Sequence, residues 1–319
     1  MLNLVSVIIP AYNAECFISE AILSVFDQSF DNFEIIVVND GSTDNTLKII
    51  SKIQDPRLKI FSQVNSGHSK ARNRGILESR GNYITFLDAD DLWAKDKLKE
   101  QILFLDNHKD YGMVYCLGNA IKSNKILITQ ISYEGYSGNI FDKIILNARF
   151  LHCSSIMIRK EILTLSNGFD ETLSHYEDWD LWLRISLLTK IGYINKVLYF
   201  QRIHKQGTTV RTFDDDTYLK NLYSIAGRYF SLPDHSAVKK ISLKKFLTYA
   251  YKMEGFRHLY FSSKLQARKY FIQAIKYSPL KIELYIAFLY TFMNSHITEI
   301  LHRKIYHKLK LEYFKLKRK

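Results

Sequence analysis

The first hundred residues alternate short β-branched runs with helical patterns, and this alternation constrains the fold more than any other feature. The apolar runs cover residues 4–10, 33–39, 57–61 and 83–87. Between the first two runs, apolar residues recur at helical spacing; they are Phe17, Ile18, Ala21, Ile22, Val25 and Phe26. Strands that alternate with helices predict an α/β fold with a doubly wound, mostly parallel sheet.

Later segments extend this sheet and then give way to helices. The runs at 111–120, 125–132 and 151–158 have the composition of strands, which predicts a mixed sheet. After about Asp214 the sequence becomes helical and dense in Lys, Tyr, Phe and Leu. We therefore predict an α/β domain at residues 1–230 and a helical, basic C-terminal region at residues 231–319.

The net charge of +13 is concentrated in this C-terminal region. Residues 235–319 carry 19 Lys and Arg against 4 Asp and Glu, whereas the preceding 234 residues carry 26 against 28. Such a region favours an anionic surface, either nucleic acid or acidic lipid headgroups. The apolar run at 284–293 has 10 residues, too few to span a bilayer, so we expect it to pack or to lie in an interface.

The cysteines and the N-terminal residues favour a cytoplasmic location. Cys16, Cys116 and Cys153 lack CxxC spacing, so we expect neither a disulfide framework nor a thiolate zinc site. The first residues contain no basic segment and no small-residue cleavage site, so we expect no export signal.

Two polar clusters follow the first two predicted strands, where an α/β sheet binds its ligand. The first, PAYNAE, contains Tyr12, which can stack on a base, although a simple turn with Asn13 as helix cap explains the same residues. The second, NDGSTD, places Asp40 at a strand end, where it can accept from a base or a ribose. We expect Asp44 to cap the helix that begins at Thr46.

The next two clusters carry opposite charges. NSGHSKARNRG, at 65–75, enters a helix with three cations, which suit phosphate oxygens, although a solvated basic face is the alternative. FLDADD, at 86–91, ends a buried strand with three carboxylates, and buried like charges require a compensating cation. A DxD there suits Mn²⁺ or Mg²⁺. Capping of a following helix explains Asp91, but it does not explain Asp88 and Asp90.

A further carboxylate cluster lies far along the chain. After GFDE, the segment YEDWDLW begins a helix, and Glu177 and Asp178 fall in its first turn, where the helix dipole favours anions. At its ordinary pKa of about 4, Asp178 is ionised at neutral pH and can accept a proton. His204 follows a predicted strand at 197–203, and we weigh a structural role and a metal-binding role equally.

Taken in order, PAYNAE, VVNDGSTDNT, NSGHSKARNRG, FLDADD, GFDE and EDWDLWLR resemble the family 2 glycosyltransferases, which have the GT-A fold, over about residues 4–205. The resemblance implies an inverting sugar transfer from a nucleotide diphosphate donor, with Mn²⁺ or Mg²⁺, and assigns Asp178 as general base. It implies that Asp90 and His204 are metal ligands and that Glu177 and Trp179 lie on the acceptor side. The implied nucleotide pocket contains Pro10, Ala11, Tyr12, Glu15, Asp40, Asn65, Gly67, Arg72, Asp88 and Ala89.

Departures from the family pattern narrow the expected activity. No QxxRW motif of processive synthases follows Asp178, which favours single-sugar transfer. UDP is expected as the nucleotide by its frequency in the family. The expected acceptor is a glycan or a lipid-linked molecule in cell-surface glycan synthesis. We expect the protein to act in the cytoplasm at the inner face of a bacterial membrane, whose anionic surface binds the basic region.

Two other classes remain as alternatives. A sugar-1-phosphate nucleotidyltransferase shares paired aspartates, but it should open with a GxGxR loop where residues 10–15 stand. A nucleotide-binding, non-enzymatic protein with a basic nucleic-acid-binding arm is the second alternative, although no nucleic-acid module is recognisable and we expect no nucleic-acid partner. A dinucleotide dehydrogenase is excluded because no GxGxxG follows the first strand.

Overall fold

The chain forms two structural units, residues 1–240 and residues 241–319. The computed structural model describes residues 4–122, 127–131, 135–146, 151–204, 215–231, 242–261 and 263–292. The segment around the predicted boundary at 230/231 lies largely outside these residues, so that boundary stays a prediction.

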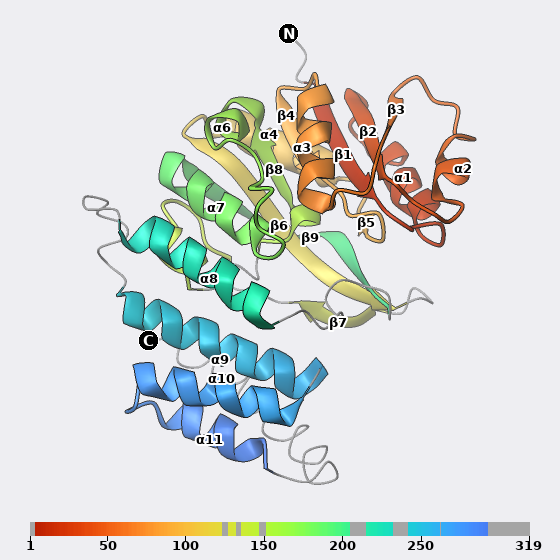
Figure 1. Cartoon of the computed structure of the whole chain (residues 1–319). Helices are drawn as coiled ribbons and strands as arrows, with labels where there is room; N and C mark the ends of the chain where they lie inside the picture. The colour runs from red at the N-terminus through yellow and green to blue at the C-terminus, as the bar shows by residue number, and fades with distance from the viewer. Residues whose placement is uncertain are drawn as a thin grey trace. The chain divides into compact units, whose positions relative to one another are not determined.

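A nine-stranded mixed sheet forms the first unit (Figure 1), in the order β3-β2-β1-β4-β8-β6-β9-β5, with β7 paired to β6. Strands β1 to β4 are mutually parallel, whereas β8 runs antiparallel to its neighbours β4 and β6. The strands are β1 (Val5–Ala11), β2 (Phe33–Asp40), β3 (Leu58–Gln63), β4 (Tyr83–Phe86), β5 (Leu92–Trp93), β6 (Tyr111–Lys122), β7 (Leu127–Ile131), β8 (Ile156–Arg159) and β9 (Lys190–Ile203).

The direction of strand addition reverses at β1. The chain places β2 and β3 on one side of β1 and then returns to place β4 on the other side. In this register Ala11 lies beside Asn39 and Ile8 beside Phe86, so the carboxyl ends of three strands meet at one edge. Open α/β sheets bind ligands at such a point.

Helices cover both faces of this sheet because side chains alternate along each strand. Val7 of β1 packs with Ile22 of α1 and Leu98 of α4 in the main core, whereas Ile36 of β2 packs with Ala71 of α3 on the opposite face. The helices of this unit are α1 (Ile18–Phe26), α2 (Thr46–Ile50), α3 (His68–Glu78), α4 (Lys97–Asn107), α5 (Phe141–Ile144), α6 (Lys160–Leu165), α7 (Glu177–Leu188) and α8 (Asp215–Phe230).

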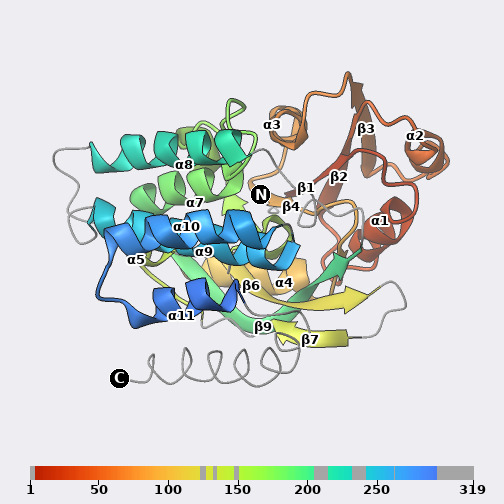
Figure 2. The same ribbon diagram turned by 60° about the horizontal axis from the view of Figure 1, so that its bottom comes forward.

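In residues 242–261 and 263–292, the described part of the second unit, three consecutive helices lie side by side (Figure 2): α9 (Leu243–Phe261), α10 (Lys264–Tyr277) and α11 (Ile282–Tyr290). Ala267 and Phe271 of α10 form its small core with Ala287 of α11. Within the described parts of the chain, no helix combines the length and the apolar character needed to cross a membrane. Met293, the last residue of the predicted apolar run, lies outside the described residues.

The mixed α/β sheet and the helical C-terminal region confirm the predicted fold class. Two local predictions were wrong. Residues 151–155 precede the strand, because Cys153–Ser155 form a 3₁₀ turn and β8 begins at Ile156. Asp91 does not cap a helix, since β5 follows it directly and α4 begins only at Lys97, after Asp96.

Candidate active site

The loops after β1 and β2 are tied together by side chains. Asn13 adopts a left-handed conformation (φ 49°), and its Oδ1 accepts the Thr43 N–H at 2.8 Å, so it is not a helix cap. The Glu15 carboxylate accepts the Asn45 N–H at 3.0 Å. The N-cap position of α2 is Asn45, not Asp44 as predicted, but Asp44 Oδ1 accepts the N–H of Thr46, the first residue of α2, at 2.9 Å and so satisfies a donor at the start of this helix. Tyr12 follows Pro10 and Ala11 of β1 and remains 44% exposed at the carboxyl-terminal edge of the sheet.

Asp40 ends β2 and fixes the turn that enters α3. Its Oδ1 accepts the Ser66 N–H at 2.9 Å and the Gln63 side-chain amide at 2.8 Å, and its Oδ2 accepts the Gly67 N–H at 2.8 Å. Gly67 has a φ of 91°, in the region that favours glycine. The buried Asp40 carboxylate therefore shapes the turn that carries Asn65 and Gly67.

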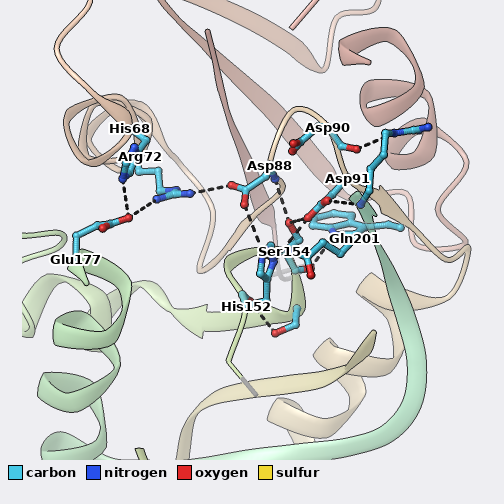
Figure 3. A network of polar contacts seen from close by, with 12 residues as sticks. His68, Arg72, Asp88, Asp90, Asp91, His152, Ser154, Glu177 and Gln201 are labelled. Carbon is cyan, nitrogen blue, oxygen red and sulfur yellow. Dashed lines mark hydrogen bonds and ion pairs between the residues drawn. The ribbon is translucent and has the colours of Figure 1, made fainter. Parts of the chain in front are cut away.

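Arg72 lies at the centre of a chain of ion pairs between α3, the loop after β4 and α7 (Figure 3). Its Nη2 donates to Asp88 Oδ1 at 2.8 Å, and its Nη1 donates to Glu177 Oε1 at 3.4 Å. The same oxygen lies 2.7 Å from His68 Nε2. Arg72 is 6% exposed and its guanidinium lies over the Phe169 ring, so a solvated basic face does not describe this residue.

The pKa values of this chain follow its contacts. Burial opposes ionisation of Glu177, but the hydrogen bond from His68 and the positive charges of His68 and Arg72 together outweigh burial and lower the pKa of Glu177. The same hydrogen bond raises the pKa of His68. These shifts favour an ionised Glu177 carboxylate whose Oε1 contacts both His68 and Arg72.

Asp178 follows Glu177 in the first turn of α7, as predicted. Its Oδ1 accepts the Trp179 N–H at 2.6 Å, while the Trp179 indole donates to the Ile144 carbonyl of α5 at 2.7 Å. Burial, together with the charge of Glu177, raises the pKa of Asp178 to about 7. The expectation of an ordinary pKa near 4 was wrong, because the neighbouring side chains remove water and add a like charge.

The three carboxylates after β4 have different partners, and Ala89, between two of them, is buried. Asp88 pairs with Arg72, and Asp90 Oδ2 lies 2.8 Å from His204 Nε2. Asp91 is 2% exposed and accepts the Ser154 hydroxyl at 2.7 Å and the Arg202 N–H at 3.1 Å. Burial and the charges of Asp90 and Asp88 raise the pKa of Asp91 well above its ordinary value. The raised pKa shows that the three neighbouring carboxylates repel one another.

His152 is a site residue that the sequence did not reveal. Its Nε2 lies 3.9 Å from Asp88 Oδ2, and its Nδ1 lies 3.6 Å from Asp91 Oδ2. Its ring stacks on Tyr199 of β9. One potential ligand atom from each of Asp88, Asp91 and His152 lies within 4.8 Å of the others. Carboxylate oxygens and an imidazole nitrogen are ligands that suit a divalent cation such as Mn²⁺.

Asn73, next to Arg72 on α3, holds the GFDE loop. Its side-chain amide donates to the Phe169 carbonyl at 2.9 Å, and its Oδ1 accepts the Phe169 N–H at 2.9 Å. Gly168 has a φ of 62°, and a Cβ at this position would lie 2.7 Å from Asn73 Oδ1. The loop therefore requires glycine here, for its backbone conformation and for close approach.

Comparison with known proteins shows the family of this chain. Residues 6–165 match the family model described as glycosyl transferase family 2. The chain belongs to this family. An uncharacterized glycosyltransferase of Haemophilus influenzae is 33% identical over 260 residues, which cover 78% of this chain and 95% of that protein. One from Rickettsia bellii is 36% identical over 212 residues, which cover 64% of this chain but only 29% of that longer protein.

Solved structures show the same fold as this family 2 chain. S. aureus TarS 1-349 superposes with a TM-score of 0.65 at 24% identity, covering 86% of this chain and 81% of that one. The mannosyltransferase PcManGT from Pyrobaculum calidifontis, solved with GDP-Man and Mn²⁺, gives a TM-score of 0.58 at 17% identity and covers 85% and 75%. The expected GT-A fold is therefore confirmed.

Proposed function

We propose that this chain transfers a single sugar, with inversion, from a UDP-sugar to an acceptor hydroxyl in cell-surface glycan synthesis. The observation that carries the proposal is the ion-pair chain at Arg72, which links Asp88 at the end of β4 to the start of α7, where Asp178 lies. Family membership supports the reaction class. A structure of S. aureus TarS 1-349 in complex with UDP-GlcNAc, with the same fold, supports the donor class.

The donor would lie over the carboxyl ends of β1, β2 and β4. Tyr12 is exposed there and can stack on the base, and the turn at Asn65 and Gly67, held by Asp40, offers the nucleoside a fixed backbone. Asp88 is the nearby carboxylate for the nucleoside. The Arg72 guanidinium is directed towards Asp88, on the side where the donor would lie. From there it can neutralise the negative charge that develops on the departing diphosphate.

Asp90 and His204 are the residues proposed to hold Mn²⁺ or Mg²⁺. Their oxygen and nitrogen atoms converge to 2.8 Å, whereas Asp88 and Asp91 in the neighbouring set are engaged by Arg72 and by Ser154. The repulsion of Asp91 by Asp88 and Asp90 is consistent with a cation, which would relieve it. When bound, the cation supplies charge neutralisation on the leaving diphosphate. The PcManGT structure, which contains Mn²⁺, supports the metal class.

Asp178 is the proposed base, which removes the proton of the acceptor hydroxyl as that oxygen attacks the anomeric carbon opposite the diphosphate. Its pKa of about 7 lies near the operating pH, where a general base is most effective. Glu177 is the weaker candidate because His68 and Arg72 already engage its carboxylate. Its proposed role, with Trp179, is to shape the acceptor side.

A donor screen tests the reaction. UDP-, GDP- and dTDP-sugars would be incubated with the full chain and Mn²⁺, and free nucleoside diphosphate would be measured. We expect UDP release from a UDP-sugar by the wild type and little release by Asp178→Asn. Release of pyrophosphate from a nucleoside triphosphate and a sugar phosphate would favour the nucleotidyltransferase instead, and consumption of none of these substrates would refute the proposal.

We further propose that the basic C-terminal region attaches to the anionic inner face of the cell membrane. On α11, the apolar side chains of Ile282, Ile286 and Leu289 are 48 to 73% exposed and recur on one helix face. Cations near an anionic surface contribute about 1 kcal/mol each. In liposome flotation we expect salt-sensitive binding to phosphatidylglycerol vesicles. Leu289→Glu should weaken this binding, whereas Leu103→Glu should not, because Leu103 lies on α4 and is similarly exposed, 55% against 62%. Equal binding to neutral vesicles would contradict this.

A further inference from the structure

Arg202, the penultimate residue of β9, is buried although it carries a charge. Arg202 is 6% exposed, and a buried guanidinium is stable only when its N–H donors are paired. Its Nη2 donates to Glu20 Oε2 of α1 at 2.9 Å, and its Nε donates to the Asp90 carbonyl at 3.0 Å. Its backbone N–H donates to Asp91 Oδ1 at 3.1 Å. One residue thus joins α1, the carboxylate loop and the end of β9.

Phe17 extends this arrangement to His204. The Arg202 guanidinium lies 5.1 Å from the centre of the Phe17 ring, and the same ring packs against the His204 imidazole with centroids 4.6 Å apart. His204 Nε2 in turn meets Asp90 Oδ2. Arg202 therefore contacts the backbone of Asp90 directly and contacts His204 through one shared aromatic ring.

We propose that Arg202 is a positioning residue that sets the geometry of Asp90 and His204 for a divalent cation. This inference rests on the proposed function, because Asp90 and His204 are its proposed metal ligands. The Arg202 side chain donates to two acceptors in different directions, from Nε and from Nη2. A lysine retains the charge but has a single nitrogen, which cannot reproduce this fork. Partners that orient metal ligands usually change metal affinity 10- to 100-fold when they are replaced.

The test measures Mn²⁺ affinity without turnover, from the EPR signal of free Mn²⁺ added to the full UDP-bound chain. We expect Arg202→Lys to weaken Mn²⁺ binding about 10- to 100-fold. The control is Arg57→Lys, because Arg57 also pairs with a carboxylate, Asp55, and also lies over an aromatic ring, Phe33. Arg57 lies at the amino-terminal ends of the strands, away from the carboxylates after β4. We expect the control to bind Mn²⁺ like the wild type.

Binding of UDP in EDTA, measured by calorimetry, separates positioning from general loss of structure. We expect Arg202→Lys to retain the wild-type UDP affinity there. Unchanged Mn²⁺ affinity in Arg202→Lys would overturn this proposal alone, as would a parallel loss of UDP binding in EDTA. A wild-type chain that binds no Mn²⁺ would overturn the metal assignment of the proposed function and this proposal with it.

Discussion

Replacing Asp178 with asparagine should make the protein less active and more stable at neutral pH. Burial and Glu177 raise the pKa of Asp178 from 3.8 to about 7, and each pKa unit corresponds to about 1.4 kcal/mol. Ionised Asp178 therefore costs the folded state on the order of 4 kcal/mol above pH 7, an upper figure for what Asp178→Asn regains. Below about pH 4 the carboxyl is protonated in both folded and unfolded states, and the difference vanishes.

Asparagine keeps the Oδ1 that accepts the Trp179 N–H, so α7 retains its first turn. Turnover should fall 100- to 10,000-fold, the usual contribution of a positioned base, while donor affinity stays unchanged. Thermal unfolding from pH 4 to pH 8 and steady-state kinetics test both parts. The reasoning is refuted if the stability difference does not grow with pH, or if turnover is retained.

The other predictions concern the remaining charged groups and one glycine. Glu177→Gln removes the like charge beside Asp178, so the acid limb of the wild-type kcat/KM profile, near pH 7, should move to lower pH; an unchanged limb would contradict the coupling. Asp90→Ala should abolish Mn²⁺-dependent turnover, while its circular dichroism spectrum should match that of the wild type. Full activity of the wild-type protein in excess EDTA would disprove the metal assignment. Gly168→Ala should lower the unfolding free energy by about 1 to 3 kcal/mol in urea titrations, because its φ is positive and Asn73 crowds it; no loss would contradict this.

The sequence predicted the features that depend on neighbouring residues. The strands β1 to β4 follow from apolar runs bounded by polar turns, and Asp44 accepts the N–H at the start of α2 because it lies two residues before Thr46. The location of Asp178 in the first turn of α7 follows from the helical spacing of Trp179 and Trp182.

Features that depend on long-range topology were not predictable from the sequence. His152 and Ser154 lie more than 60 residues after Asp91 in the sequence. They contact Asp91 because β8, which follows them, pairs antiparallel with both β4 and β6. Arg202 reaches Asp91 across 111 residues through the end of β9. The raised pKa of Asp178 likewise arises from packing, since burial is its main cause and no local pattern reports it.

Helix α3 has a mechanical consequence for catalysis. Arg72 binds the donor-side carboxylate Asp88, and the adjacent Asn73 holds the Phe169 backbone in the loop that leads to α7. Two neighbouring residues on one helix thus set the separation between the proposed donor-binding residues and Asp178, the proposed base. The site cannot widen by moving the 168–171 loop without breaking the paired Asn73–Phe169 hydrogen bonds. If the proposed function holds, this helix fixes the distance between the leaving group and the incoming hydroxyl.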